Sequence, residues 1–142
     1  MDEIDRGLIA LLREDARTPV ATLARRLHVA RSTVQARLER LETTGAIAGY
    51  TLRLGDAARL DGLRASILLG IEPRAQAPVP SRLKAMPEVE RVFTTSGRFD
   101  LLVQISCPDA ATLDGLLDRI GAMPGVKGSE SLIHLSTRID RA

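Results

Sequence analysis

The chain has 142 residues and a formal net charge of only +2, which suits one domain or two small ones. Hydrophobic residues make up 44% and aromatic residues 2%, without Trp, so a globular fold would need an aliphatic core. No apolar run approaches the ~20 residues of a membrane span, and the acidic first residues do not resemble a secretory leader. The single cysteine, Cys107, excludes an internal disulfide. We therefore expect a cytoplasmic protein without a membrane partner.

The chain begins with an amphipathic helix. An apolar stripe runs along it, and acidic residues near its start favour the positive end of the helix dipole. We expect this helix to end between residues 14 and 17. Thr18 and Pro19 then predict a new helix, with Thr18 as the N-cap and Pro19 as the first helical residue. The stripe consists of Ile4, Leu8, Leu11 and Leu12.

The helix that starts at Thr18-Pro19 is the first of two predicted between Val20 and Leu41, which are joined by a connection of about four residues at His28. Their apolar residues recur at i, i+3/i+4 and i+7, which places them on one face of each helix. Two short helices with so tight a connection are typical of a helix-turn-helix. The apolar residues are Val20, Leu23, Ala24 and Leu27, then Val34, Leu38 and Leu41.

The same stretch is locally basic, with five arginines against one acidic residue, Glu39. Such a face is either simply solvated or binds phosphate. A recognition helix meets base edges with its N-terminal turn, where arginine suits guanine and glutamine suits adenine. We assign base readout to Arg31, Ser32, Thr33 and Gln35, and phosphate contacts to Arg25, Arg26, Arg37 and Arg40.

A wing and a linker are predicted after these helices. Gly45 is placed to end the recognition helix in a left-handed cap, and the alternation in Ile47–Leu54 predicts a short strand. Residues 1–54 would then form a winged helix-turn-helix domain. The polar, glycine-bounded residues 55–62 are interpreted as a linker to a second domain, 63–142.

In this second domain the apolar period changes from 3.6 to 2. Helices are expected at 79–86 and 109–123. An internal echo, AMPEV at 85–89 and AMPGV at 122–126, places a helix end and a strand start at equivalent points. The pattern predicts an α+β, ferredoxin-like βαββαβ domain. Its strands are expected over Ala65–Ile71, Val89–Thr95, Leu101–Cys107 and Ser129–Thr137.

One face of such a sheet is covered by its helices and the other is bare. An open, partly apolar face is most simply buried by a second copy of the chain, so we predict a two-fold homodimer. The residues expected there are Leu68, Leu102, Ile133 and Leu135, with Ser66, Gln104 and Ser106.

The ordered motifs along the chain resemble those of the Lrp/AsnC, or feast/famine, transcription regulators. The resemblance covers nearly the whole chain and implies DNA binding, dimers that often assemble into tetramers of dimers (octamers), and control by a small molecule, usually an amino acid. Apart from this possible amino-acid effector, we expect no cofactor and no bound metal, because the sequence shows no metal-ligand cluster. The residues that carry it are IDRGLIALL (4–12), EDAR (14–17), Leu23-Ala24, STV (32–34), Arg37, RLE (40–42), GAI (45–47), Gly49-Tyr50 and SGRFDLL (96–102).

The family's effector site lies between subunits, at the turn between the second and third strands. Exposed backbone N–H groups at a glycine turn can hold a carboxylate, and the acidic residue that ends this turn could pair with an α-ammonium. The alternative is an ordinary hairpin turn. On this chain the turn consists of Thr95, Ser96, Gly97, Arg98, Phe99 and Asp100.

Two residues depart from the family pattern. His28 and Ala30 stand where the family commonly has Gly at the turn and Ser at the N-cap. Because Ser32 to Gln35 fit a capping box, the start of the recognition helix is left between Ala30 and Ser32. The departure at Ala30 also keeps open a dimerisation or amino-acid-binding module that has lost DNA binding.

An enzyme is the remaining alternative, because decarboxylases of sirohaem-type tetrapyrroles share the architecture. Those carry His and aromatic residues near the corresponding hairpin, whereas the hairpin here has no His. His134 is interpreted as a packing or interface residue. Since no catalytic triad, metal cluster or phosphate loop is evident, we expect a regulator and not an enzyme.

Overall fold

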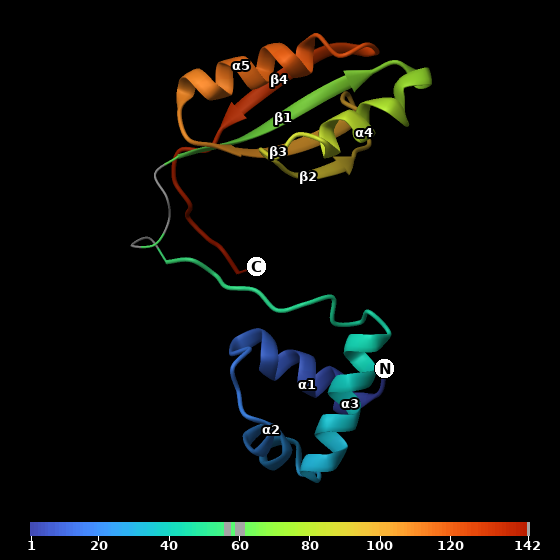
Figure 1. Cartoon of the computed structure of the whole chain (residues 1–142), viewed down its shortest axis with the longest axis vertical. Coiled ribbons are helices and arrows are strands. Elements are labelled where there is room, and N and C mark those ends of the chain that lie inside the picture. The colour runs from blue at the N-terminus through green and yellow to red at the C-terminus, as the bar shows by residue number, and fades with distance from the viewer. Residues whose placement is uncertain (56–57, 59–61, 142) are drawn as a thin grey trace. The chain divides into compact units, whose positions relative to one another are not determined.

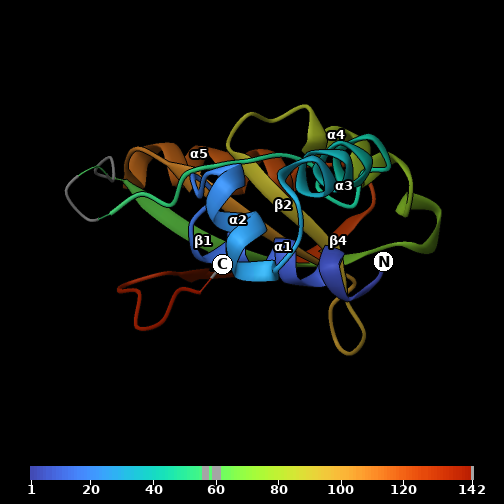
Figure 2. The same ribbon diagram turned by 90° about the horizontal axis from the view of Figure 1, so that it is seen from below.

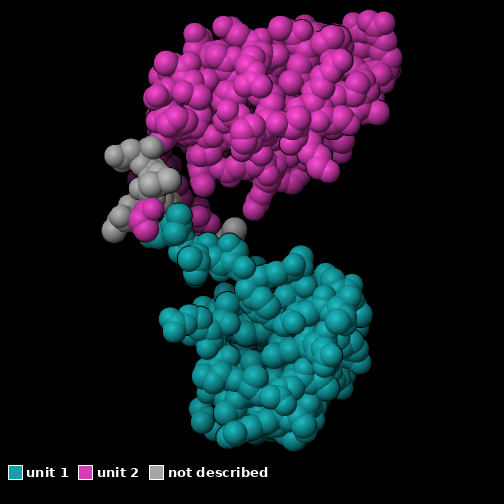
Figure 3. Space-filling view, in the orientation of Figure 1, with its two compact units in different colours: residues 1–57 teal, residues 58–142 magenta. Residues whose placement is uncertain are grey.

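The computed structural model describes residues 1–55, 58 and 62–141. The chain forms two compact units, residues 1–57 and 58–142 (Figure 3). Most of the predicted linker, at 56–57 and 59–61, lies outside the described residues. The domain limits of 54 and 63 therefore stay predictions.

The N-terminal unit contains three helices, α1 (Glu3–Glu14), α2 (Val20–Leu27) and α3 (Arg31–Thr43) (Figure 1). Their predicted apolar faces meet in one small core, which confirms the helical periodicity. Gly7 lets α1 and α2 approach closely, because a Cβ there would lie 2.7 Å from the Leu27 Cδ2. The buried members of this core are Leu8, Leu23, Ala24, Val34 and Leu41.

The capping predicted for α2 is wrong by one residue. Pro19 is itself the N-cap, with φ −62° and ψ 150°, and its carbonyl accepts from the N–H groups of Thr22 and Leu23, both at 3.0 Å. Thr18 does not cap the helix; its hydroxyl instead donates to the Asp15 carbonyl at 2.7 Å. The cause is the extended ψ of Pro19, which puts the first helical residue at Val20.

The turn between α2 and α3 settles where the recognition helix begins. His28 ends α2 in the left-handed region, with φ 57° and ψ 43°. Ala30 is the N-cap of α3, and no side chain caps that helix. Ser32 is therefore the second helical residue, and the alternative start at Ser32 is wrong. The N-cap is Ala30 because its carbonyl accepts the first hydrogen bonds of the helix, from the N–H groups of Thr33 and Val34.

Beyond α3, the cap is confirmed and the wing is not. Gly45 has φ +80°, and the following backbone folds back so that the Ile47 N–H donates to the Leu41 carbonyl at 2.8 Å. Residues 47–54, all of them described, form no strand. The predicted strand Ile47–Leu54 is wrong for this chain, because its backbone pairs with no neighbouring strand in the described part of the structure.

The C-terminal unit has the predicted βαββαβ order, with the sheet order β2-β3-β1-β4. All three strand pairs are antiparallel. Helices α4 and α5 cover the same side of the sheet (Figures 1 and 2). The elements are β1 (Leu63–Ile71), a 3-10 turn η2 (Pro73–Ala75), α4 (Pro78–Lys84), β2 (Val89–Thr94), β3 (Leu101–Cys107), α5 (Ala110–Gly121) and β4 (Val126–Ile133).

The AMP echo marks equivalent points of the two halves. Both β2 and β4 begin at the valine of their copy, Val89 and Val126. The prediction of β4 at 129–137 is three to four residues late. The reason is long-range: β1 pairs with β4 from Ile71 opposite Val126 to Ala65 opposite Ile133, and this register sets both ends.

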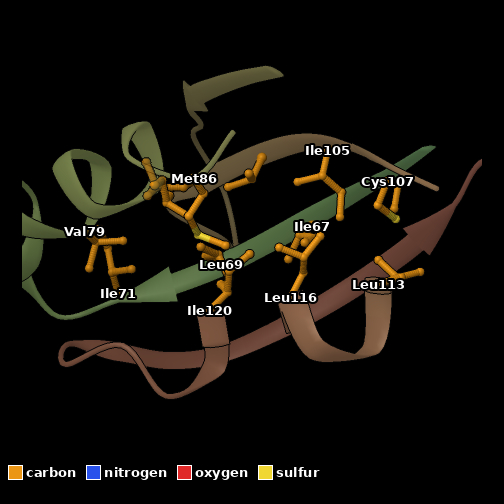
Figure 4. Close-up of a cluster of buried hydrophobic side chains, with 14 of the residues drawn as sticks. Ile67, Leu69, Ile71, Val79, Met86, Ile105, Cys107, Leu113, Leu116 and Ile120 are labelled. Atoms are coloured by element: carbon orange, nitrogen blue, oxygen red, sulfur yellow. The ribbon is translucent and has the colours of Figure 1, made fainter. Parts of the chain in front are cut away.

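Alternate residues of β1 and β3 point toward α4 and α5 and make the main core (Figure 4). The buried positions of both strands fall at every second residue, as expected for a sheet covered on one face. The labelled side chains in Figure 4 come from both strands, from both helices and, for Met86, from the connection that follows α4. They are Ile67, Leu69, Ile71, Val79, Met86, Ile105, Cys107, Leu113, Leu116 and Ile120.

The register also corrects the predicted open face of the sheet. Ile133 lies opposite the buried Ala65, so it belongs to the helix-covered side. Leu135 lies beyond the end of β4. Leu132, opposite Ser66, takes the open-face position instead. The apolar residues on this face are Leu68, Phe93, Leu102 and Leu132.

Candidate DNA-binding surface and effector turn

The exposed side of α3 presents polar side chains beside its N-terminus. Arg31, Ser32 and Gln35 are exposed, Thr33 is half-buried, and Val34 is fully buried in the core. Helical periodicity explains this division, because Val34 points to the face of α3 that packs on the core while the polar residues point to other faces. Three of the four predicted readout residues are thus free to reach a ligand, and the fourth is partly covered.

Arg25 and Arg26 lie in the last turn of α2 and are both exposed. Among the residues that the structure describes, neither of them has a carboxylate partner, and nor does Arg31. These guanidinium groups therefore keep their donors available for an external anion.

Arg37 and Arg40 have partners inside the protein. Arg37 donates to Asp2, and its Nη1 lies 3.4 Å from the Asp5 Oδ1. Arg40 Nη2 lies 2.9 Å from the Asp5 Oδ2. Asp2 and Asp5 also cap α1 reciprocally, each carboxylate accepting from the other residue's N–H. The side-chain hydrogen bond from Arg37 lowers the pKa of Asp2 to about 2.

Asp5 is a buried charged residue that the sequence patterns did not single out. It is 1% exposed, the one charged residue among the buried positions that the structure describes. Its signal was positional: Asp5 precedes Leu8 and Leu12 at i+3 and i+7, so it lies on the apolar face of α1. From the sequence, the charge of Asp5 was explained only by its place near the positive end of the helix dipole.

The turn between β2 and β3 projects beyond the strands and is held by its own backbone (Figure 2). The Thr95 N–H donates to the Asp100 carbonyl at 2.9 Å, and the Thr95 hydroxyl donates to the Phe99 carbonyl at 2.7 Å. Gly97 has φ +113°, a conformation that glycine adopts without strain. Ser96 and Gly97 are exposed at the tip.

Asp100 and Arg98 connect this turn to neighbouring strands. The Asp100 N–H donates to the Leu69 carbonyl, and its carboxylate accepts from the Ile71 N–H, both at 2.8 Å. The Arg98 guanidinium stacks 5.2 Å from the Phe99 ring centroid and lies 3.5 Å from Glu130 of β4. All six predicted turn residues thus lie together, and Asp100 already has a structural role.

No group of three or more potential metal ligands occurs among the described residues. His134 Nε2 lies 2.8 Å from the Ser66 hydroxyl, with no carboxylate recorded behind it in the described structure. Burial raises the pKa of the Cys107 thiol, which disfavours the reactive thiolate. Within the described ranges, no helix is long and apolar enough to cross a membrane.

Comparison with known proteins matches both units to families. Residues 1–42 match the AsnC-type helix-turn-helix domain, and residues 64–142 match the Lrp/AsnC ligand binding domain. The transcriptional regulator FL11 of Pyrococcus horikoshii is 31% identical over 96% of this chain and 91% of its own.

Solved structures agree over the full length. The leucine response regulatory protein LrpA of Mycobacterium tuberculosis is 31% identical, with a TM-score of 0.85 over 100% of this chain and 97% of its own. A transcriptional regulator of Neisseria meningitidis, NMB0573, solved as a complex with L-Met, is 25% identical, with a TM-score of 0.87 over 99% and 93%. The chain therefore belongs to the Lrp/AsnC family of transcriptional regulators.

Proposed function

We propose that this regulator reads double-stranded DNA with the N-terminal half of α3. The observation that carries the proposal is the exposure of Arg31, Ser32 and Gln35 beside the free N-terminus of that helix. Arginine can bind guanine and glutamine can bind adenine through paired hydrogen bonds in the major groove. Thr33, which is half-buried, contributes from the edge of this surface.

Phosphate contacts come from the neighbouring helix. Arg25 and Arg26 are exposed and unpaired in the described structure, so binding a phosphate breaks no internal ion pair. The first-turn N–H groups of α3 also lack a side-chain acceptor, because Ala30 has no side-chain oxygen. A DNA phosphate is a suitable acceptor at a helix N-terminus.

The test separates readout from affinity. We expect Gln35→Ala to relax sequence preference in a selection from random duplexes, because its amide is the base-reading group. Arg26→Ala is the matched control: it should weaken all sites alike and reduce the slope of log K against log salt by about 0.9. If Gln35→Ala selected the same sites as the wild type, the readout assignment would be wrong.

We also propose that the open face of the C-terminal sheet forms a two-fold dimer, which can assemble further into tetramers of dimers. Leu132 on this face is 51% exposed, and burying such apolar area favours association.

Leu132→Glu should lower the association constant of the dimer in equilibrium ultracentrifugation. Leu135→Glu, at a side chain that is 95% exposed beyond β4, should not. A monomeric wild type at micromolar concentration would contradict the dimer. A dimer predicts pseudo-palindromic half-sites on DNA.

The turn Thr95–Asp100 is the proposed effector site, between two subunits. The Neisseria relative solved with L-Met supports an amino acid as the class of effector. Exposed N–H groups around Gly97 would receive the carboxylate. The Asp100 carboxylate, which accepts one hydrogen bond, from the Ile71 N–H, would receive the α-ammonium.

A thermal-shift screen of the common amino acids tests this site, because a bound ligand raises the midpoint of thermal unfolding by mass action. No shift with any of them would argue against an amino-acid effector.

Regulation, and not catalysis, is the function proposed for the whole chain. The related proteins are named as transcriptional regulators, and a regulator of this kind acts where the chromosome is, so we place it in the cytoplasm. A tetrapyrrole decarboxylase is not favoured, since the hairpin that would carry its histidine is TTSGRFD.

A further inference from the structure

A network of charges joins the first turn of α1 to the middle of α3. It consists of Asp2 and Asp5 on α1 with Arg37 and Arg40 on α3, residues that are 32 to 35 positions apart in the chain. It is the one recorded set of ion pairs, among the described residues, that links two helices of the N-terminal unit.

The two arginines of this network lie on the flank of α3 that meets α1, with Arg40 still more than half exposed. Thr33, Arg37 and Arg40 follow the i, i+4, i+7 spacing and so share one flank. Their carboxylate partners show that this flank is turned toward α1. The Arg37 side chain is 24% exposed and the Arg40 side chain 56% exposed, and Gln35 lies on the exposed side.

Asp5 gives the network its strength. A carboxylate that is 1% exposed must be compensated by hydrogen bonds and counter-charges. Its Oδ2 accepts from Arg40 and from the Asp2 N–H, and its Oδ1 faces Arg37. If either arginine left for a DNA phosphate, this buried charge would lose part of its compensation.

We infer that Asp2 and Asp5 are positioning residues for DNA recognition, which fix α3 through Arg37 and Arg40. The two arginines then act through the orientation of the helix and not as phosphate contacts. The inference rests on the proposed DNA-reading function of α3, and it replaces the phosphate role that the sequence pattern suggested for this pair.

The sign of one substitution distinguishes positioning from plain electrostatics. Asp5→Asn removes a negative charge from a DNA-binding unit, so long-range electrostatics alone would strengthen binding. Positioning predicts the opposite, a loss of affinity of about two- to thirtyfold. Asp2→Asn is the milder second variant, because asparagine caps helices as well as aspartate while losing the charge that Arg37 meets.

Glu3→Gln is the matched control. Glu3 lies in the same first turn, is exposed, and has no recorded ion pair in the described structure. Its removal should leave DNA affinity unchanged or slightly increased. Arg37→Ala and Arg40→Ala should weaken binding with the salt slope of the wild type. Arg25→Ala, at a proposed phosphate contact, should reduce that slope by about 0.9.

A measurement without DNA keeps this inference separate from the proposed function. Hydrogen exchange of the α3 amides should accelerate in Asp2→Asn and Asp5→Asn and not in Glu3→Gln, because α3 loses an anchor. Unchanged α3 exchange in both aspartate variants would overturn the inference. Tighter DNA binding by Asp5→Asn would overturn it too, as would a reduced salt slope for Arg37→Ala. A wild type without salt-dependent duplex binding, but with the expected exchange pattern, would refute the DNA-reading proposal and would leave Asp2 and Asp5 as anchors of α3 with no role in DNA recognition.

Discussion

Gly125 stands in the second copy of the echo where the first copy has Glu88. It lies between α5 and β4 with φ +93°, and a Cβ built there would be 2.3 Å from the Ala75 Cβ in η2. We expect Gly125→Ala to add backbone strain of about 1–2 kcal/mol and steric overlap of about 1–3 kcal/mol. The free energy of unfolding of this unit should therefore fall by about 2–5 kcal/mol.

Equilibrium unfolding in urea, followed by circular dichroism, measures this loss. Adding Ala75→Gly to Gly125→Ala removes the overlapping methyl and should recover the steric part while leaving the strain. Gly115→Ala, within α5 and with open space around its Cβ position, is the matched control and should stabilise by up to about 1 kcal/mol. A Gly125→Ala protein as stable as the wild type would show that the turn relaxes freely, and the reasoning from close approach would fail.

Three further predictions concern the N-terminal unit. His28→Gly should stabilise it by about 0.5–1 kcal/mol in thermal melts, because glycine adopts the left-handed conformation of this residue without the side-chain penalty; a lower midpoint would reveal a favourable role of the imidazole. Ala30→Ser should add about 1 kcal/mol by capping the Thr33 N–H, and an unchanged midpoint would speak against a free N-terminus of α3. Because the hydrogen bond from Arg37 lowers the pKa of Asp2 from 3.8 to about 2, its stabilisation is complete above about pH 4 and is lost as the pH falls through about 2. The difference in melting midpoint between wild type and Asp2→Asn should shrink over that window, and a constant difference would point to a cause other than this titration.

Periodicity was the reliable part of the sequence information. The buried positions of β1 and β3 fall at every second residue, and those of α5 follow a helical stripe, because burial of one face imposes the period of the element. Boundaries that depend on long-range pairing were predicted less well. The ends of β4 follow its register with β1, which no local pattern encodes.

Local turn chemistry was predicted in part. Gly45 follows the end of α3 with positive φ, as its residue type suggests, whereas Asp109, which was expected inside the helix, is the N-cap of α5 and accepts from the Thr112 N–H at 2.7 Å. The prediction of a strand at 47–54 was wrong because alternating side chains do not by themselves supply a partner strand. Tyr50 alternates as expected, yet its hydroxyl bonds to Glu42 of α3.

For the candidate DNA-binding surface, too, part of the information came from the sequence and part from the tertiary structure. The sequence by itself determined which arginines and polar residues α3 and α2 carry, and helical spacing correctly placed Gln35 outside and Val34 inside. Only the tertiary structure decided which charges are free. Arg37 and Arg40 meet carboxylates that lie more than thirty residues away in the chain. Such a pair forms because packing of α1 on α3 buries Asp5, and a buried charge must be compensated by whatever the fold brings beside it.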